Sequence, residues 1–291
     1  MPEGKILKGV SGSYTVKTDA GVLICKPRGI FRKDGITPLA GDNVIAQNLS
    51  ETEGIIDEIL PRKNALTRPP VANLDILFVI IAVEKPDPSP IVIDKLIALC
   101  EQNDIEPIIC INKIDLKQEC GLFEVYKKAG FHTFQTSAAN CEGIDSIFSY
   151  ISKKVCAFAG SSGVGKTSLL NCLGLKTSEG VGAVSAKTAR GKHTTRHVEL
   201  FELNDGFIAD TPGFQDLSFE SIQSVSKENV QFLFREFAPL IGNCRFHDCS
   251  HMNEPDCAVK KAVENGEVAV SRYESYTSLF TEIKNRRPSW G

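Results

Sequence analysis

The chain lacks the features that mark membrane and exported proteins. Its longest apolar run, Ile76 to Val83, is far shorter than the roughly 20 residues that a membrane span needs. The first residues lack the basic and apolar segments of a signal peptide. No internal repeat or low-complexity tract occurs. We therefore expect a cytoplasmic globular protein without a membrane partner.

An excess of positive charge is also missing, because the formal net charge of the 291 residues is −3. General affinity for nucleic acid is therefore not expected, and DNA is not a predicted partner. Local cationic patches remain candidates for RNA contacts, although an ordinary solvated surface is the favoured interpretation of any one patch alone. These patches are Arg62 to Asn64, Arg190 to His193 and Lys284 to Arg287.

The ten cysteines do not indicate a disulfide framework, since the chain is long and most of them are scattered. We expect the scattered set to be reduced and mostly buried. That set is Cys25, Cys100, Cys110, Cys120, Cys141, Cys156 and Cys172.

Glycine-punctuated short apolar runs over residues 1–65 predict a small β-barrel of about five strands. An oligonucleotide-binding (OB) barrel fits this size, and an SH3-like barrel is the alternative. The following stretch, Pro61 to Pro70, contains three prolines and three cations and is interpreted as a linker.

Residues 66–218 alternate strand-like and helix-like patterns, which predicts an α/β domain with a mostly parallel sheet. The β-branched run from Leu74 to Val83 is typical of a strand buried on both faces. Expected strands follow at 107–112, 131–136, 155–159, 198–203 and 207–210, with helices at 91–102, 121–129, 143–153 and 166–173. Residues 219–291 have helical character, with amphipathic segments at 226–237 and 271–287.

The segment from Gly160 to Thr167 matches the phosphate-loop pattern G-x-x-x-x-G-K-[ST]. Backbone N–H groups of such a loop bind phosphate, the lysine reaches the outer phosphates, and the threonine hydroxyl ligates Mg²⁺. A predicted strand precedes it and a predicted helix follows it, as this chemistry requires. The predicted nucleotide contacts here are Gly160, Ser161, Ser162, Gly163, Val164, Gly165, Lys166, Thr167 and Ser168.

A second motif, Asn112-Lys113-Ile114-Asp115, ends the strand at 107–112. Its aspartate is suited to accept from the N1–H and amino group of guanine, while its asparagine reads the other edge. Ser137 and Ala138 end the next strand, where a backbone N–H meets guanine O6. Two base-reading elements on neighbouring strands predict GTP and GDP rather than ATP.

These base-reading elements precede the phosphate loop, whereas conventional GTPases begin with the phosphate loop. The order predicts a circularly permuted P-loop GTPase core, because the ligand site lies at strand ends whichever strand comes first. A phosphate-loop kinase is the alternative enzyme, but it has no use for the asparagine-lysine-x-aspartate motif.

Two further segments are interpreted as nucleotide-sensing switches. Asp210-Thr211-Pro212-Gly213 follows an apolar strand, which places Asp210 to hold Mg²⁺ and the Gly213 N–H to sense the γ-phosphate. The polar segment from Thr188 to Arg196 is the predicted first switch, in which Thr194 or Thr195, with a preference for Thr195, completes the Mg²⁺ shell.

Phe214 stands where related enzymes carry a water-orienting glutamine, which predicts slow intrinsic hydrolysis. His193 is the nearest polar candidate for that task, and a partner's residue is the alternative. The residues assigned to catalysis are Lys166, Thr167, Asp210, His193 and Thr195.

Cys244, Cys249, His251 and Cys257 supply three thiols and an imidazole within fourteen residues. Soft ligands at this spacing predict one tetrahedral structural Zn²⁺ ion, with reduced cysteines in a helical cap as the alternative. His247 competes with His251 as a ligand, and Asp248 and Asp256 are candidates for supporting contacts.

Taken together, these motifs closely resemble the ribosome small-subunit-dependent GTPases, the RsgA or YjeQ family. The resemblance covers nearly the whole chain and includes Arg190 to Thr195, Asp210 to Phe214 and Cys244 to Cys257. It implies an N-terminal OB barrel, a permuted GTPase core and a C-terminal zinc domain. It further implies a monomer that acts late in 30S subunit maturation, contacts 16S rRNA through both outer domains and hydrolyses GTP faster on the particle.

One position departs from the family's switch pattern R-G-R-H-T-T, because Lys192 occupies its third place. The change preserves charge but loses bidentate phosphate recognition. A nucleotide-dependent RNA-binding scaffold with incidental hydrolysis is the second functional hypothesis.

Overall fold

The computed structural model describes residues 2–117, 121–175, 198–210 and 225–286. His193, Thr194, Thr195 and Gly213, which we predict to lie in the switches, fall outside these ranges. Within them, no helix combines the length and apolar character needed to cross a bilayer.

The N-terminal strands form a closed barrel. They are β1 (Glu3–Val10), β2 (Ser13–Thr18), β3 (Gly21–Pro27), β4 (Asn43–Asn48) and β5 (Glu53–Ile59). The pairing runs β1-β2-β3-β5-β4, and β4 returns to β1 to close the barrel around Ile6, Val16 and Ile56. A short helix, α1 (Gly29–Lys33), joins β3 to β4. Five strands closed in this order form an OB-type barrel, which resolves the two barrel types considered from the sequence.

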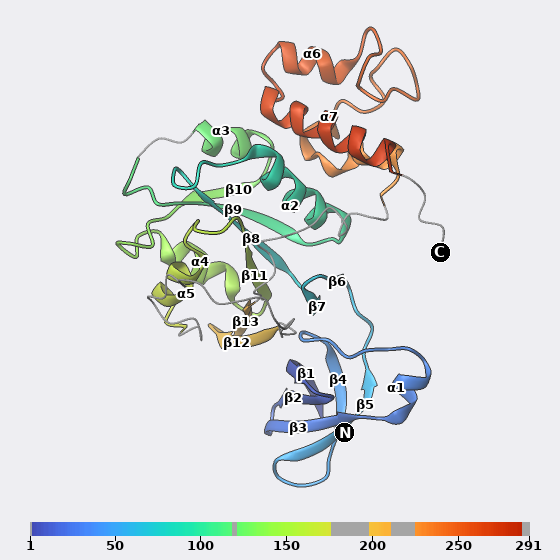
Figure 1. The fold of residues 1–291 in the computed structure, drawn as a ribbon, viewed down its shortest axis with the longest axis vertical. Helices are drawn as coiled ribbons and strands as arrows, with labels where there is room; N and C mark the ends of the chain where they lie inside the picture. Colours follow the sequence, from blue (N-terminus) through green and yellow to red (C-terminus); the bar gives the residue numbers. More distant parts are fainter. Residues whose placement is uncertain (1, 118–120, 176–197, 211–224, 287–291) are drawn as a thin grey trace, which may run out of the picture.

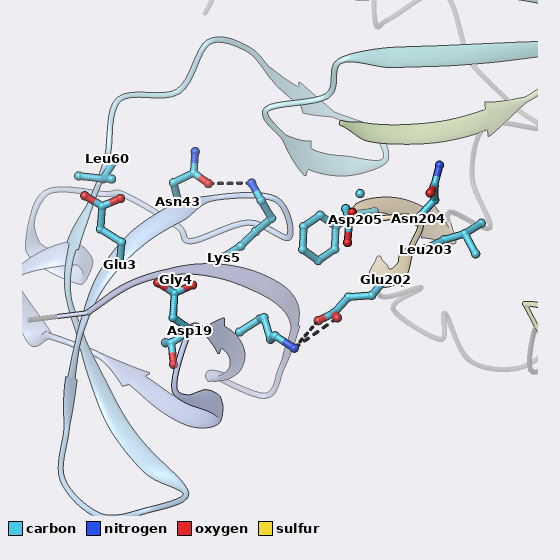
Figure 2. Close-up of a pocket in the computed structure, with 14 residues that line it drawn as sticks. Glu3, Gly4, Lys5, Asp19, Asn43, Leu60, Glu202, Leu203, Asn204 and Asp205 are labelled. Carbon is cyan, nitrogen blue, oxygen red and sulfur yellow. Dashed lines mark hydrogen bonds and ion pairs between the residues drawn. The ribbon is translucent and has the colours of Figure 1, made fainter. Parts of the chain in front are cut away.

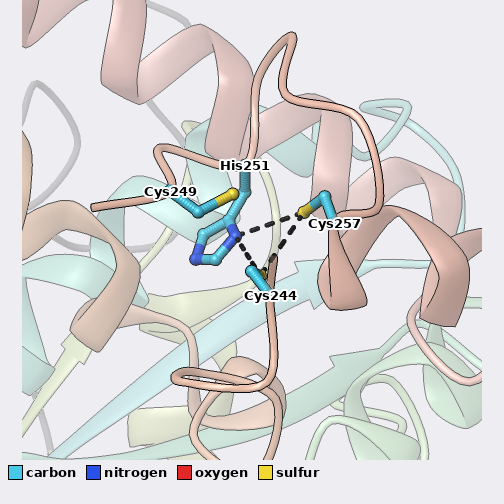
Figure 3. Close-up of side chains that lie close together, drawn as sticks. All are labelled: Cys244, Cys249, His251 and Cys257. Atoms are coloured by element: carbon cyan, nitrogen blue, oxygen red, sulfur yellow. Dashed lines mark hydrogen bonds between the residues drawn. The ribbon is translucent and has the colours of Figure 1, made fainter. Parts of the chain in front are cut away.

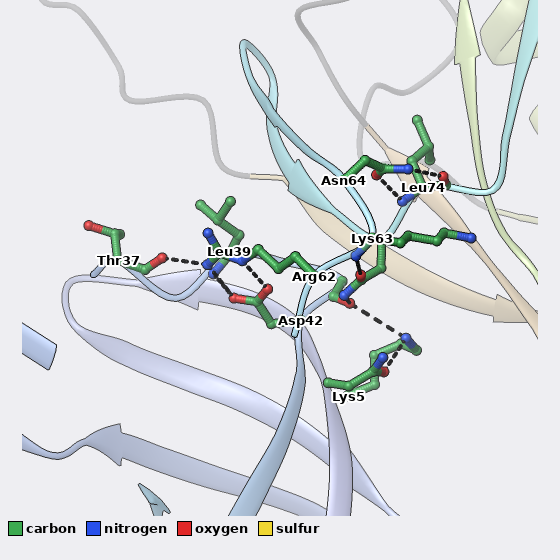
Figure 4. A network of polar contacts seen from close by, with 11 residues as sticks. Lys5, Thr37, Leu39, Asp42, Arg62, Lys63, Asn64 and Leu74 are labelled. Carbon is green, nitrogen blue, oxygen red and sulfur yellow. Dashed lines mark hydrogen bonds and ion pairs between the residues drawn. The ribbon is translucent and has the colours of Figure 1, made fainter. Parts of the chain in front are cut away.

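The segment predicted to be a linker is in part a β-hairpin of β6 (Ala65–Thr67) and β7 (Pro70–Ala72). Arg62 donates through Nε and Nη2 to the fully buried Asp42 over 2.6 and 2.8 Å, and Asn64 bonds Leu74 in both directions (Figure 4). The hydrogen bond to Asp42 raises the pKa of Arg62. Pro69 therefore lies in the turn of the hairpin and Pro70 begins β7, while Arg62 binds a buried carboxylate and is not part of a free cationic patch.

The core sheet has the order β10-β9-β8-β11-β13-β12. Its strands are β8 (Ile76–Ala82), β9 (Glu106–Asn112), β10 (His132–Gln135), β11 (Val155–Ala159), β12 (Glu199–Leu203) and β13 (Gly206–Asp210). All neighbours are parallel except the antiparallel β12–β13 pair. The polar segments that follow β9, β10, β11 and β13 consequently gather at one edge of the sheet.

Every residue of β8 is buried, as expected for a central parallel strand. Leu77, Val79 and Ile81 pack on the face covered by α2 (Pro90–Gln102), whereas Ile76, Phe78 and Ile80 pack in the cluster on the other face. That second face carries α4 (Ile144–Ile151) and α5 (Lys166–Cys172). Among the described residues, the core also contains α3 (Gly121–Lys128).

The barrel is joined edge to edge with the core sheet, because Lys8 of β1 pairs with Glu199 of β12. Their side chains form an ion pair at 2.7 Å, and Lys17 pairs with Glu202 at 3.0 Å. A cleft of about 940 Å³ lies between the two units (Figure 2). Barrel and core therefore share one continuous sheet.

The C-terminal module packs on α2, at the end of the core opposite the barrel (Figure 1). It contains α6 (Ala258–Glu264) and α7 (Val270–Lys284). The segment 226–237, expected to form an amphipathic helix, instead contains two 3₁₀ segments, η2 (Lys227–Leu233) and η3 (Arg235–Phe237). The module's aromatic residues, including Phe237 and Tyr276, continue the hydrophobic cluster that begins under α2.

Candidate nucleotide site and metal centre

The phosphate-loop segment connects the end of β11 to the start of α5, as the sequence predicts. Gly160 and Gly165 have φ angles of 144° and 102°, which L side chains rarely adopt. A Cβ atom at Gly160 would overlap the Ile80 carbonyl oxygen, and one at Gly165 would overlap the amide of Asn112. Both glycines are therefore required by the close approach of neighbouring strands.

Lys166 folds back over this loop. Its Nζ donates to the carbonyl oxygens of Gly160 at 2.7 Å and Ser161 at 2.9 Å. Burial lowers the pKa of the ammonium group to about 8. A partly desolvated cation held at the mouth of an N–H-lined loop is suited to an anionic ligand.

Asn112 joins the base-reading side of the site to the phosphate loop. Its side chain is fully buried, and its Nδ2 donates to the carbonyl oxygen of Val164 at 2.8 Å. Its Oδ1 accepts from the backbone N–H of Ala138 at 3.0 Å and from the hydroxyl of Thr136 at 3.1 Å. Sequence reasoning assigned Asn112 only to the base, whereas the structure also gives it this tethering role.

Asp115 lies beside the following loop, where Ser137 donates from Oγ to its Oδ1 at 2.6 Å. The Asp115 side chain is exposed, while Ser137 is buried. Lys113, at a φ of 67°, donates to the carbonyl oxygen of Lys85. The exposed carboxylate is therefore oriented by Ser137 and remains accessible to a ligand.

The remaining described candidates gather at the same edge of the sheet. Thr167 and Ser168 lie in the first turn of α5, and Asp210 is the last residue of β13. Ser162 and Gly163 are exposed in the phosphate loop. The structure thus brings together the predicted base-reading and phosphate-binding segments and Asp210, while His193, Thr195 and Gly213 lie outside the described residues.

Two cysteines of this region were wrongly expected to be reduced. Cys141, in the loop between β10 and α4 (the base loop, residues 136–143), is joined by a disulfide to Cys172, the last residue of α5. By contrast, Cys25, Cys100, Cys110 and Cys156 are free and buried, as predicted, and Cys120 lies outside the described residues. The 31-residue separation of Cys141 and Cys172 gave no sequence signal for their pairing.

The four predicted metal ligands form one cluster in the C-terminal module (Figure 3). One ligand atom from each of Cys244, Cys249, His251 and Cys257 lies within 4.8 Å of the others. The Sγ atoms of Cys244 and Cys257 are 3.9 Å apart, and His251 Nδ1 is 3.5 and 3.3 Å from them. Tetrahedral zinc with bonds of about 2.3 Å to sulfur separates its sulfurs by roughly 3.8 Å, so this donor set fits that ion.

Gln231 of η2 supports the cluster, a role that its distance in sequence concealed. Its Oε1 lies 2.9 Å from His251 Nε2, which leaves Nδ1 facing the thiols. Glu254 fixes the ligand loop by accepting from Ser250 and from the Met252 N–H.

Two alternatives considered for this centre are wrong. His247 is exposed and is not part of the cluster. Asp256 forms an ion pair with Arg245 at 3.2 Å in place of supporting a ligand.

The fold and site together define a circularly permuted P-loop GTPase, with base-reading strands preceding the phosphate loop. Comparison with known families agrees: residues 59–220 match the profile described as "RsgA GTPase", and residues 3–56 match the "RsgA N-terminal domain". The chain belongs to the RsgA GTPase family, and the expected resemblance is confirmed.

Relatives with this family name resemble the chain along its length. The "Small ribosomal subunit biogenesis GTPase RsgA" of Caldanaerobacter subterraneus subsp. tengcongensis is 44% identical over 288 residues, covering 98% of this chain and 96% of its own. The protein of the same name from Bacillus subtilis is 42% identical over 305 residues, with complete coverage of both chains.

Two solved structures share the fold. YloQ, described as a circularly permuted GTPase, is 38% identical, has a TM-score of 0.83, and covers 100% of this chain and 97% of its own. YjeQ from Thermotoga maritima is 35% identical, has a TM-score of 0.82, and covers 98% of this chain and 99% of its own. Hydrolysis of GTP is the activity of this family.

Proposed function

We propose that the chain hydrolyses GTP to GDP and phosphate as a late-stage assembly factor of the 30S ribosomal subunit, and that it binds 16S rRNA. The position of Asn112 is the main support for guanine-nucleotide binding. Its side chain connects the base loop at Ala138 to the phosphate loop at Val164. The names of the relatives support the assembly role.

We further propose a division of labour among three modules, residues 1–65, 66–218 and 219–291. The family profiles at 3–56 and 59–220 support the first boundary. The outer modules bind RNA and the central one binds nucleotide. A monomer in the cytoplasm, without DNA or membrane partners, suits a factor of this kind.

In the proposed site, each residue of this chain has a separate task. The Asp115 carboxylate accepts from the N1–H and amino group of guanine. The Ala138 N–H, which donates to Asn112 Oδ1 in this structure, turns to guanine O6. Lys166 leaves the Gly160 and Ser161 carbonyls, which hold it in this structure, and turns to the phosphates. Backbone N–H groups from Gly160 to Thr167, with Ser168, bind the phosphate oxygens at the start of α5.

Thr167 and Asp210 would hold Mg²⁺, with Thr195 as a further candidate. When bound, the ion supplies charge neutralisation at the phosphates. The Gly213 N–H is proposed to sense the γ-phosphate, and His193 to orient the attacking water. Cys244, Cys249, His251 and Cys257 would hold one Zn²⁺ ion, which has a structural role because all four positions of the tetrahedron are taken by protein.

Turnover measured with and without purified small subunits tests the assembly role. We expect the particle to stimulate GTP hydrolysis, and Lys166→Ala and Thr167→Ala to abolish it while circular dichroism stays unchanged. Similar slow rates with and without particles would contradict the proposal and favour a scaffold whose hydrolysis is incidental.

Base recognition is tested separately with Asp115→Asn. This variant should shift preference from GTP toward xanthosine triphosphate. The new Asn amide can donate where the carboxylate accepted, and xanthine carries an acceptor oxygen where guanine carries its amino group. Wild-type selectivity for GTP in a competition assay would refute the role of Asp115.

A further inference from the structure

Cys141 and Cys172 belong to two elements that flank the proposed nucleotide site. Cys141 belongs to the loop that follows β10, and this loop is closed by reciprocal backbone hydrogen bonds between Ser137 and Glu142 at 3.1 and 3.0 Å. Cys172 ends α5, the helix that begins at Lys166. A bond between them ties the base loop to the phosphate-loop helix.

The geometry of the pair allows both a bonded and an unbonded state. The Cα atoms of Cys141 and Cys172 are 5.6 Å apart, within the usual range for a disulfide. Cys172 Sγ also lies 3.3 Å from the carbonyl oxygen of Ala138. A thiol at Cys172 donates weakly to that carbonyl, whereas a disulfide sulfur has no proton to donate. Cys172 therefore contacts the base loop at Ala138 as well as at Cys141.

Accessibility distinguishes this pair from the other cysteines of the core. Cys141 is exposed and Cys172 is half-buried. Cys100, Cys110 and Cys156 are buried, and burial raises the pKa of each thiol, which leaves them unreactive. An accessible thiol beside a second one is the arrangement expected of a reversible redox site.

We propose that Cys141 and Cys172 form a reversible thiol modification site whose disulfide slows the exchange of guanine nucleotide. The effect on exchange rests on the proposed nucleotide site, while the disulfide chemistry does not. In the reduced protein the base loop separates from α5 by breaking weak contacts. In the oxidised protein a covalent bond adds to the Asn112 tether and opposes that separation.

Hydrogen peroxide is a sufficient oxidant. The Cys141 thiolate attacks the peroxide, so an S–O bond forms, the O–O bond breaks, and the departing hydroxide takes a proton to become water. The Cys172 thiolate then attacks the Cys141 sulfur, the S–S bond forms, and the S–O bond breaks to release a second water. Two thiols lose two electrons and two protons, and one peroxide becomes two waters. A dithiol reductant of the thioredoxin class reverses the step and is itself oxidised.

The experiment compares zinc-loaded protein after treatment with peroxide and with a dithiol reductant. Peptide mapping by mass spectrometry is expected to find Cys141 linked to Cys172 only in the oxidised sample. Release of a fluorescent GDP analogue should then be slower by about threefold or more, and reduction should restore the faster rate.

Matched variants separate this site from oxidation elsewhere. Cys141→Ser and Cys172→Ser should each release the analogue at the reduced wild-type rate after either treatment, while Cys25→Ala, in the barrel core, should keep the full response. Zinc content measured in parallel identifies any loss at the C-terminal cluster.

Two results would overturn the proposal: free thiols at both positions after oxidation, or a linked pair with an unchanged release rate. If the reduced protein failed to bind the analogue, the proposed nucleotide site would be wrong, and the peptide map would still decide whether the disulfide forms.

Discussion

Arg272 of α7 donates to Asp94 of α2 across 2.6 Å, and each side chain is only 1% exposed. The same guanidinium pairs with Glu236 of η3 at 2.6 Å, and the hydroxyl of Tyr126 donates to Asp94 at 3.0 Å. Charges buried this deeply require their partners. This cluster therefore fixes the C-terminal module on the GTPase core.

Loss of the buried pair is expected to destabilise the protein strongly. Arg272→Met leaves two carboxylates buried without their cation and should cost about 3–5 kcal/mol of unfolding free energy. Lys95→Met is the matched control, because Lys95 pairs with Glu282 between the same two helices at 29% and 40% exposure. That loss should stay below about 1 kcal/mol. Urea unfolding of the zinc-loaded protein measures the loss of unfolding free energy in both variants. Equal losses would contradict the conclusion that the Arg272 cluster fixes the module on the core.

The lowered pKa of Lys166 predicts proton uptake when nucleotide binds. Burial brings this pKa to about 8, so above that pH much of the free protein carries a neutral lysine. Phosphate favours the charged form, and binding should therefore take up a proton to an extent that grows as pH rises through 8. Calorimetry of GDP binding in buffers of different ionisation enthalpy measures this uptake. A constant value from about pH 7 to about pH 9 would contradict the role of Lys166.

The same pKa determines a dependence of stability on pH. Because the folded pKa lies below the ordinary value of 10.5, the unfolded chain binds more protons between about pH 8 and about pH 10.5. The contribution of Lys166 to stability of the nucleotide-free protein therefore rises with pH across this window. Lys166→Met should remove that slope in thermal unfolding.

Substitution of Gly165 is expected to disrupt the site through Asn112. Gly165→Ala places a methyl group against the Asn112 amide and should lower GTP turnover by about a hundredfold. Gly130→Ala is the control, since Gly130 has a similar φ of 91° but faces open space. Steady-state hydrolysis of both variants measures the difference. Equal losses of turnover in the two variants would show that backbone strain, and not contact with Asn112, causes the effect.

Gln231 is expected to strengthen metal binding through the imidazole of His251. Gln231→Ala removes the acceptor for Nε2–H and should weaken zinc affinity by about 10- to 100-fold, whereas Gln231→Glu keeps an acceptor oxygen. Competition with a chromophoric chelator measures both. Unchanged affinity in Gln231→Ala would show that His251 is oriented by other contacts.

Local signals explain what the sequence could predict. The run from Leu74 to Val83 predicts a strand buried on both faces because a central parallel strand is apolar on both sides, and β8 is that strand. The phosphate loop and the cluster from Cys244 to Cys257 depend on short spacings, so their residues could be named in advance. The OB-type barrel was one of two types that its glycine spacing allowed, and pairing between β3 and β5 distinguishes them.

Contacts between distant segments account for what was missed. Gln231 reaches His251 over 20 residues, and Cys141 reaches Cys172 over 31. Neither spacing carries a pattern. The β6–β7 hairpin was hidden because Pro70 disfavours a strand except at an edge, and a two-stranded hairpin consists only of edges.

The permuted order also governs how the protein is made. After the barrel, translation delivers β8, α2, β9, α3 and β10 before the rest of the core, and in this unit parallel neighbours are separated by single helices. The nascent chain thus acquires its base-reading loop tens of residues before β11 and α5 emerge. A product interrupted near Lys153 would contain the guanine-reading half but no phosphate loop, so the nucleotide site is complete only after β11, α5 and β13 have been made.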